Sequence, residues 1–112
     1  ILMIGVAYKK DVDDMRESPS LILIELLEDQ GALVDYHDNF VPIIPSTRDH
    51  ASLSGRKSVD LTSKAIKSYD LVLIGTNHTD CDYQLLADSA NIILDTRNAM
   101  KNISGSAVIL KA

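Results

Sequence analysis

Several residue types are scarce in this sequence of 112 residues, and each shortage excludes a class of protein. The single cysteine, Cys81, leaves no disulfide partner within the chain and favours a reducing, cytoplasmic location. No apolar run approaches the roughly 20 residues that a membrane-spanning helix needs, so no membrane contact is expected. The net charge of −5 argues against a nucleic-acid partner, because such binding depends on a positive surface.

The residues that are present predict one packed domain covering positions 1–112. Hydrophobic residues make up 46% of the chain, while tryptophan is absent, so the core must be mainly aliphatic. The sequence opens inside an apolar stretch at Ile1 without an initiator methionine. We therefore expect a fragment of a longer protein, the alternative being a processed domain that is complete in itself.

Apolar stretches alternate with amphipathic ones along the chain. Strands are expected at 1–7, 33–37, 70–75, 91–95 and 107–110. Helices are expected at 18–30, from Asp60 or Thr62 to Ser68, and at 82–89. This alternation predicts an α/β fold, a three-layer Rossmann-like domain with a mostly parallel sheet. The expected strand order is second, first, third, fourth, fifth, with a reversal between the first and third strands.

Local signals mark the first helix and a long connection after the second strand. Ser18 followed by Pro19 is typical of an N-cap and first helical position, and Gly31 suits the residue that ends the helix. The stretch 40–58 contains two prolines and a glycine and is predicted to be irregular. Such a long linker should either be mobile or pack against another part of the protein.

Four basic side chains lie in the loops that follow predicted strands. Lys9 follows the first strand, His78 the third and Arg97 the fourth, and Arg16 precedes the first helix. The carboxyl ends of parallel strands share one edge, and ligands bind there at the point where the strand order reverses. Because the chain is acidic overall, clustered cations at this edge predict an anionic ligand, with phosphate the natural match.

Each of these residues also has a structural explanation that the sequence leaves open. Lys9 could be a solvated surface residue, and Arg16 could order its loop by pairing with a neighbouring acid. Arg97 could pair with Asp95, and His78 could be an ordinary hydrogen-bonded surface residue. Tyr8 could provide an apolar platform beside the ligand or simply pack.

Other residues argue against further chemistries. The first strand leads into Gly5 without G-x-G-x-x-G, so NAD should not bind here in the usual dinucleotide manner. Asp38 resembles the ribose-binding acid of such folds, but alone it is a weak signal. The histidines and Cys81 lack metal-ligand spacing, which predicts no metal site. Asp13 and Asp14 could suggest a phosphoacceptor pocket, but the third strand ends in Gly-Thr-Asn rather than the aspartate such a pocket needs.

Residues 5–19 read GVAYKKDVDDMRESP and fill every position of G-x-[AS]-[FY]-K-x-[DN]-x-[DG]-D-x-R-x-S-[PS]. This pattern resembles the start of the C-terminal, UDP-binding domain of the UDP-glucose/GDP-mannose dehydrogenase family. Four further matches follow in order: GA at 31–32, YHD at 36–38, GTNH at 75–78 and DTRN at 95–98. The resemblance covers about residues 1–98 and is nearest to the bacterial UDP-N-acetyl-hexosamine branch at residues 12–19.

The resemblance implies an NAD-dependent enzyme that oxidises the 6-hydroxyl of a UDP-sugar to a carboxylate for polysaccharide precursor synthesis. The NAD-binding and central domains and the catalytic cysteine would lie upstream, so the chain alone should be inactive and contain no catalytic residue. The resemblance implies that Lys9 and Arg97 contact the nucleotide-sugar end and that Arg16 reaches the NAD cofactor across the domain cleft. Tyr8 and His78 complete the expected substrate-binding residues, from their place at the same edge of the sheet. The implied partners are the UDP-sugar, the N-terminal NAD-binding domain and further copies in a homo-oligomer.

Two departures and two competing functions accompany this hypothesis. Asn39 follows Asp38 where the family usually has proline, and Cys81 lies outside the family's G-G-x-C-x-x-K-D motif. Acids on both sides of Cys81 should raise the pKa of its thiol and disfavour a nucleophilic thiolate. The competing functions are a non-catalytic nucleotide-binding or assembly module of the same fold, and a plain α/β interaction domain whose edge charges pair internally.

Overall fold

Five short strands form one parallel sheet in the computed structural model, which describes residues 1–112. The strands are β1 (Leu2–Ile4), β2 (Asp35–His37), β3 (Val72–Ile74), β4 (Ile92–Asp95) and β5 (Val108–Lys111). Their order is β2-β1-β3-β4-β5, and every neighbouring pair is parallel. The predicted fold class, strand order and reversal between β1 and β3 are therefore confirmed.

The strands are shorter than the apolar runs that predicted them. β1 ends at Ile4 because the next residue, Gly5, turns the chain with a φ of 82°. The backbone N–H groups of Val6 and Ala7 then donate to the carboxylate of Asp38, at 2.9 and 3.3 Å. A side chain thus replaces a neighbouring strand as the hydrogen-bond partner, so the ladder stops although the sequence remains apolar.

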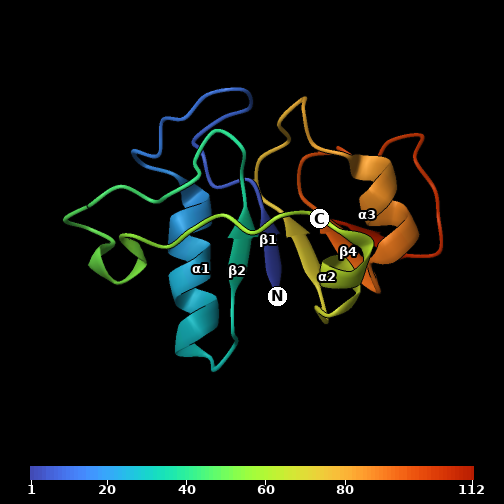
Figure 1. The fold of residues 1–112 in the computed structure, drawn as a ribbon, viewed down its shortest axis with the longest axis horizontal. Coiled ribbons are helices and arrows are strands. Elements are labelled where there is room, and N and C mark those ends of the chain that lie inside the picture. The colour runs from blue at the N-terminus through green and yellow to red at the C-terminus, as the bar shows by residue number, and fades with distance from the viewer.

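Helices cover both faces of the sheet, which gives the three predicted layers (Figure 1). They are α1 (Pro19–Asp29), α2 (Ser63–Lys67) and α3 (Tyr83–Ser89), with a 3₁₀ turn, η1, at Ala51–Leu53. Side chains of a strand alternate between faces. Met3 joins a core cluster with Ile24 of α1, whereas Leu2 joins a second cluster with Ile66 of α2 and Leu86 of α3. None of the helices is long and apolar enough to cross a membrane.

The predicted helix signals are realised with one difference. Ser18 occupies the N-cap position of α1, but its hydroxyl donates to the carbonyl of Val6 at 2.7 Å instead of capping the helix. Thr62, rather than Asp60, caps α2 by accepting a hydrogen bond from the Ala65 N–H at 3.1 Å. Gly31 follows the C-cap of α1 with a φ of 94°, in the left-handed conformation that favours glycine.

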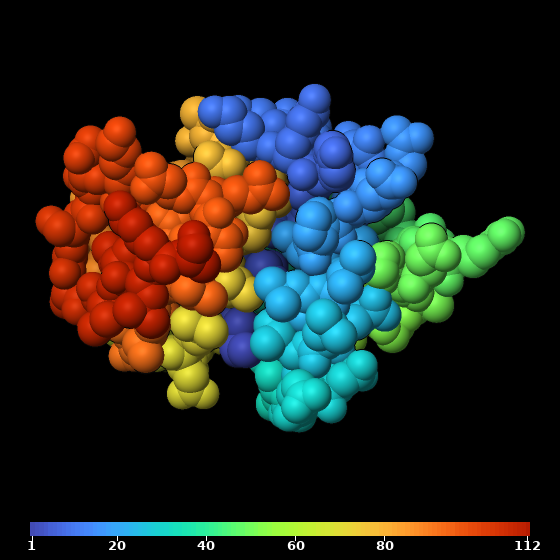
Figure 2. All heavy atoms as spheres, turned by 180° about the vertical axis from the view of Figure 1, so that it is seen from behind, coloured from blue at the N-terminus to red at the C-terminus, as the bar shows by residue number.

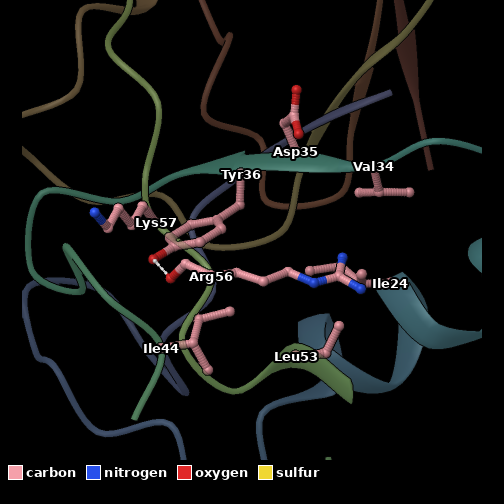
Figure 3. A pocket seen from close by; sticks show the side chains of 8 residues that line it. All are labelled: Ile24, Val34, Asp35, Tyr36, Ile44, Leu53, Arg56 and Lys57. Carbon is pink, nitrogen blue, oxygen red and sulfur yellow. Dashed lines mark hydrogen bonds between the residues drawn. The ribbon is translucent and has the colours of Figure 1, made fainter.

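The long connection after β2 packs against α1 and β2 of the same domain. The Arg56 guanidinium donates to both carboxylate oxygens of Glu28 in α1, at 2.7 and 2.9 Å. His50 contacts Glu25 one turn earlier on the same helix. The Tyr36 hydroxyl lies 2.8 Å from the carbonyl oxygen of Val41 and 3.1 Å from that of Arg56. Between this connection, α1 and β2 lies a cavity of about 370 Å³ (Figure 3).

The layer that contains α1 covers only part of its sheet face. In the view from behind, α1 lies on one side and the C-terminal residues on the other, with β1 and β3 visible between them (Figure 2). Leu110 pairs in register with Leu94, which packs against the same cluster as α1. Leu110 and Val108 are about half exposed, so the β5 side of this face carries apolar residues that no helix covers.

The close approach of Gly5 to Thr76, in the loop after β3, predicts a measurable cost of adding one methyl group. A Cβ at Gly5 would overlap the backbone carbonyl of Thr76, in addition to the strain of a positive φ. We expect Gly5→Ala to lower the free energy of unfolding by about 3 kcal/mol or more, measured by urea denaturation. Gly55→Ala is the matched control, because Gly55 has a φ of 83° but nothing within 4 Å, and it should cost only about 1–2 kcal/mol. Equal losses in the two variants would contradict a role for the Gly5–Thr76 contact.

Candidate functional site

The residues predicted to bind the ligand lie in loops at the carboxyl edge of the sheet. Tyr8, Lys9 and Arg16 belong to the loop between β1 and α1, His78 follows β3 and Arg97 follows β4. β1 and β3 are neighbours in the sheet, and their connections leave in opposite directions. The edge therefore has the strand reversal at which open α/β sheets bind ligands.

The loop between β1 and α1 folds back on itself through Asp14. The N–H of Tyr8 donates to the carbonyl of Asp14 at 2.6 Å. The Arg16 guanidinium donates to both carboxylate oxygens of Asp14, at 3.1 and 3.0 Å, and these hydrogen bonds hold the pKa of Asp14 below its usual value. Arg16 thus orders its own loop, as one alternative suggested. Its side chain is still 89% exposed, so the pair adds little stability and the guanidinium faces solvent.

Arg97 has a different partner from the one the sequence suggested. Its Nε donates to the carbonyl of Gly75 at 3.0 Å, and its terminal nitrogens form no hydrogen bond within the chain. Asp95 instead accepts backbone N–H groups of the following turn, from Arg97 at 3.0 Å, Ala99 at 3.1 Å and Met100 at 2.8 Å. The buried Asp95 carboxylate therefore shapes the turn, while the exposed guanidinium of Arg97 remains available for a ligand.

Lys111 is a candidate that the sequence analysis missed. It pairs in register with Asp95 across β4 and β5, which brings it to the same edge as Arg97. These residues line a hollow of about 450 Å³ together with Thr96, Asn98 and Ala112. The fifth strand was expected to end at residue 110, so the sequence did not place Lys111 at the carboxyl edge. The usable signal was its position directly after the apolar run of β5.

The structure does not bring all the predicted residues into one cavity. Tyr8 and Arg16 line one hollow of about 380 Å³ with Asp14 and Glu17. Arg97 lines the separate hollow beside Lys111. The side chain of Lys9 is exposed and forms no hydrogen bond within the chain. A ligand that contacts all the cations would therefore extend along the edge across the strand reversal.

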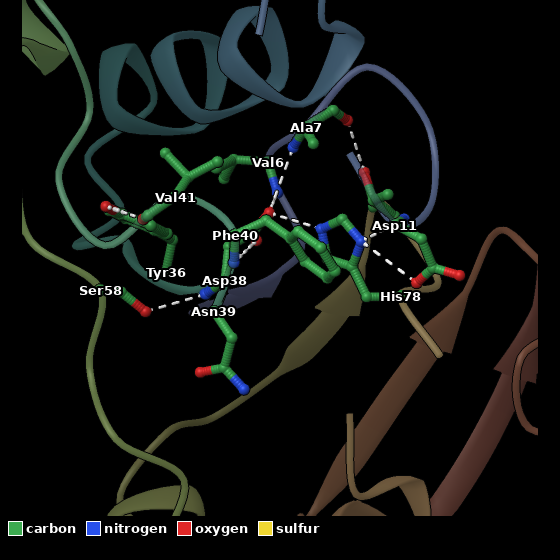
Figure 4. A network of polar contacts seen from close by, with 12 residues as sticks. Val6, Ala7, Asp11, Tyr36, Asp38, Asn39, Phe40, Val41, Ser58 and His78 are labelled. Atoms are coloured by element: carbon green, nitrogen blue, oxygen red, sulfur yellow. Dashed lines mark hydrogen bonds and ion pairs between the residues drawn. The ribbon is translucent and has the colours of Figure 1, made fainter. Parts of the chain in front are cut away.

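His78 is buried rather than exposed at the surface. Only 3% of it is exposed, and its Nε2 lies 2.8 Å from Oδ2 of Asp38 (Figure 4). The backbone N–H of Asp11 donates to its Nδ1 at 2.7 Å, and the ring of Phe40 lies against it with 4.6 Å between centroids. Both ring nitrogens are thus occupied within the protein. A direct contact between His78 and the ligand stays a prediction.

The carboxylate of Asp38 is not available to bind a ribose, unlike the acid of a dinucleotide site. It is 1% exposed, and its Oδ1 accepts the N–H of Phe40 at 2.9 Å while Oδ2 receives Val6, Ala7 and His78. The N–H groups that could meet a pyrophosphate after β1 are therefore already bonded. Together with the missing glycine motif, this arrangement does not fit an NAD molecule bound in the usual dinucleotide manner.

Cys81 has none of the features of an activated nucleophile. Burial raises the pKa of its thiol to about 12, and the neighbouring carboxylates of Asp80 and Asp82 add to the effect. The sequence analysis predicted the direction from the carboxylates, whereas burial is the larger cause. A thiol with so high a pKa remains protonated and weakly nucleophilic near neutral pH.

Comparison with known proteins gives consistent matches over nearly the whole chain. Residues 2–102 match the model of the UDP-glucose/GDP-mannose dehydrogenase family, UDP binding domain. The chain is 30% identical over 104 residues to UDP-glucose 6-dehydrogenase YwqF of Bacillus subtilis, covering 88% of this chain and 23% of that protein. It is 27% identical over 106 residues to UDP-N-acetyl-D-mannosamine dehydrogenase of Pyrococcus horikoshii, covering 90% and 22%.

A solved structure agrees with these sequence matches. The UDP-N-acetyl-mannosamine dehydrogenase Cap5O from S. aureus superimposes with a TM-score of 0.70 and 28% identity, over 98% of this chain and 25% of that one. The chain thus spans about a quarter of the length of the relatives it matches.

The raised pKa of Cys81 predicts slow alkylation of the folded chain. At pH 8 iodoacetamide should react at least about tenfold more slowly with the folded chain than with the urea-unfolded chain, because only the thiolate reacts and burial disfavours it. The rate for the folded chain should still be rising above pH 9, since the thiol titrates near pH 12. Mass spectrometry follows the reaction, and Cys81→Ser provides the blank. Equal rates before and after unfolding would show an accessible, ordinary thiol.

Proposed function

The chain belongs to the UDP-glucose/GDP-mannose dehydrogenase family, and we propose that it is the UDP-sugar-binding domain of an NAD-dependent UDP-sugar 6-dehydrogenase. The family match covers almost all of the chain and names a UDP-binding domain. The observation that carries the proposal for the site is the arrangement of exposed cations along the carboxyl edge, at the strand reversal of an otherwise acidic domain.

Within this proposal each edge residue has a defined part. Lys9 contributes a point charge to the diphosphate, and the free terminal nitrogens of Arg97 can bind phosphate oxygens through charge-assisted hydrogen bonds. Tyr8, which is 47% exposed, offers a ring face beside the nucleotide. His78 is the fourth substrate-binding residue of the proposal, and its buried ring lies behind the surface that Lys9 and Tyr8 form. No side chain of the chain is assigned a catalytic role.

The whole protein would oxidise the 6-hydroxyl of the sugar to a carboxylate while two NAD⁺ are reduced. NAD would be held mainly by an N-terminal domain, because the loop after β1 does not fit a dinucleotide. Arg16 would reach towards that cofactor across the cleft between domains, which its exposed guanidinium permits. Closing the cleft over the UDP-sugar would exclude water and bring the reacting groups together.

Finer features of the proposal follow from relatives and residues together. The relatives include both a UDP-glucose 6-dehydrogenase and a UDP-N-acetyl-D-mannosamine dehydrogenase. We favour the second type of substrate, a UDP-N-acetyl-hexosamine, because residues 12–19 resemble that branch. We further propose that the full-length protein is a cytoplasmic homo-oligomer that supplies polysaccharide precursors.

The charges at the edge predict a specific loss of affinity on mutation. Lys9→Ala and Arg97→Ala should each weaken UDP binding by about 1.5–3 kcal/mol, the scale of hydrogen bonds to charged groups, measured by isothermal titration calorimetry. The urea midpoint should barely move, because neither side chain is buried.

Two exposed lysines provide matched controls for this prediction. Lys10→Ala removes a charge beside Lys9, and Lys101→Ala removes one from the loop that carries Arg97. Both controls should bind UDP within about threefold of the original chain. If Lys9→Ala and Arg97→Ala unfold readily while their UDP affinity is unchanged, the two residues are structural and the assignment is wrong.

A further inference from the structure

His78 connects three segments that are far apart in the sequence. Its ring lies between Asp38, which follows β2, and Asp11, in the loop between β1 and α1 (Figure 4). The carboxylate of Asp38 also accepts the N–H groups of Val6 and Ala7. The backbone is therefore fixed on both sides of residues 8–10, once at Ala7 and once at Asp11.

Only one form of the imidazole satisfies both of its contacts. The backbone amide of Asp11 can only donate, so Nδ1 must carry a lone pair, 2.7 Å away. Nε2 then carries the proton and donates to Asp38 at 2.8 Å. A proton on Nδ1 would face the Asp11 N–H and break that bond, while the Asp11 carboxylate, at 3.9 Å, is too distant to replace it.

Asp11 is held from a second direction by the loop that contains His78. The N–H of Thr79 donates to the Asp11 carboxylate at 2.7 Å, and the Thr79 hydroxyl contacts the same group. Asp11 itself has a φ of 62°, a left-handed conformation that costs free energy outside glycine. These contacts hold the backbone in a strained conformation directly after Lys9 and Lys10.

We propose that His78, together with Asp38, is a positioning residue that holds the turn at residues 8–10 so that Lys9 and Tyr8 meet the nucleotide diphosphate. This inference rests on the proposed function. The Lys9 side chain has no hydrogen bond of its own, so its placement depends on the backbone that His78 fixes. Holding that backbone before the ligand arrives removes part of the ordering cost of binding.

His37 shows what a histidine in a similar setting does without a link to the ligand loop. It is 9% exposed, ends β2 next to Asp38, and its Nδ1 lies 2.7 Å from the carbonyl oxygen of Val59. Its contact is with the connection that covers β2, away from the loop between β1 and α1. His37 is therefore a matched control for a change at His78.

The test compares His78→Phe, His78→Asn and His37→Phe with the original chain, using UDP-glucose as the probe. UDP-glucose is chosen because, unlike UDP, it has no terminal phosphate that titrates near pH 6. His78→Phe should weaken binding by about tenfold or more, whereas His37→Phe should leave the affinity within about threefold. His78→Asn should recover most of the affinity, because its Oδ1 can accept the Asp11 N–H.

Two NMR measurements keep the proposal testable if His78→Phe does not fold. In the original chain, ¹⁵N shifts should show a protonated Nε2 and an unprotonated Nδ1 of His78 at neutral pH. The Asp11 amide should be protected from hydrogen exchange in the original chain and in His78→Asn. The opposite tautomer, or an unprotected Asp11 amide, would overturn the proposal.

The binding outcomes separate this inference from the proposed function. If neither the original chain nor the full-length protein binds UDP-glucose, the proposed function is wrong and the positioning role is wrong with it. If the original chain binds and a folded His78→Phe binds equally well, only the positioning role is wrong. Equal losses of UDP-glucose affinity in His78→Phe and His37→Phe would likewise show that His78 does not position the loop.

Discussion

The hydrogen bonds accepted by the buried carboxylate of Asp38 are the interaction on which the candidate site depends. One oxygen receives Val6, Ala7 and His78, and the other receives Phe40. These bonds end β1, turn the chain after β2 and join both to the loop after β3. Without such an acceptor, the N–H groups at the end of β1 would be buried and unpaired, which costs free energy. The same carboxylate thus shapes the fold and the surface that carries Lys9.

The placement of charges explains how an acidic domain can offer an anion site. Asp38 follows β2 and Asp95 ends β4, both at the carboxyl edge of the sheet. Both are nevertheless about 1% exposed and accept hydrogen bonds from backbone N–H groups. Lys9, Arg97 and Lys111 lie at that edge with their side chains exposed. The carboxylates point inward and organise the loops, while the cations point outward. The net charge of −5 therefore says little about the potential at the edge itself.

The sequence predicted the sheet order because buried parallel strands leave long apolar runs separated by helix signals. It overestimated the lengths of strands, since side-chain acceptors such as Asp38 end a strand without changing its hydrophobicity. It placed Lys9, Arg16 and Arg97 at the correct edge, because strand ends follow from the runs. It offered the pairing of Arg16 with a neighbouring acid as an alternative, because Asp14 is only two residues away. It could not foresee the burial of His78, because that depends on contacts with two other loops. Lys111 was within reach but lay one residue beyond the predicted strand.

The central claim is that the strand-reversal edge of this chain binds the uridine diphosphate end of a nucleotide sugar rather than a dinucleotide. The most direct measurement is an NMR titration of the chain with UDP, with NAD⁺ added to a parallel sample. The account predicts UDP-induced shifts concentrated at Tyr8, Lys9, His78 and Arg97, with little response to NAD⁺. Shifts from NAD⁺ at the same residues would contradict it, as would no response to UDP at millimolar concentrations from both this chain and the full-length protein.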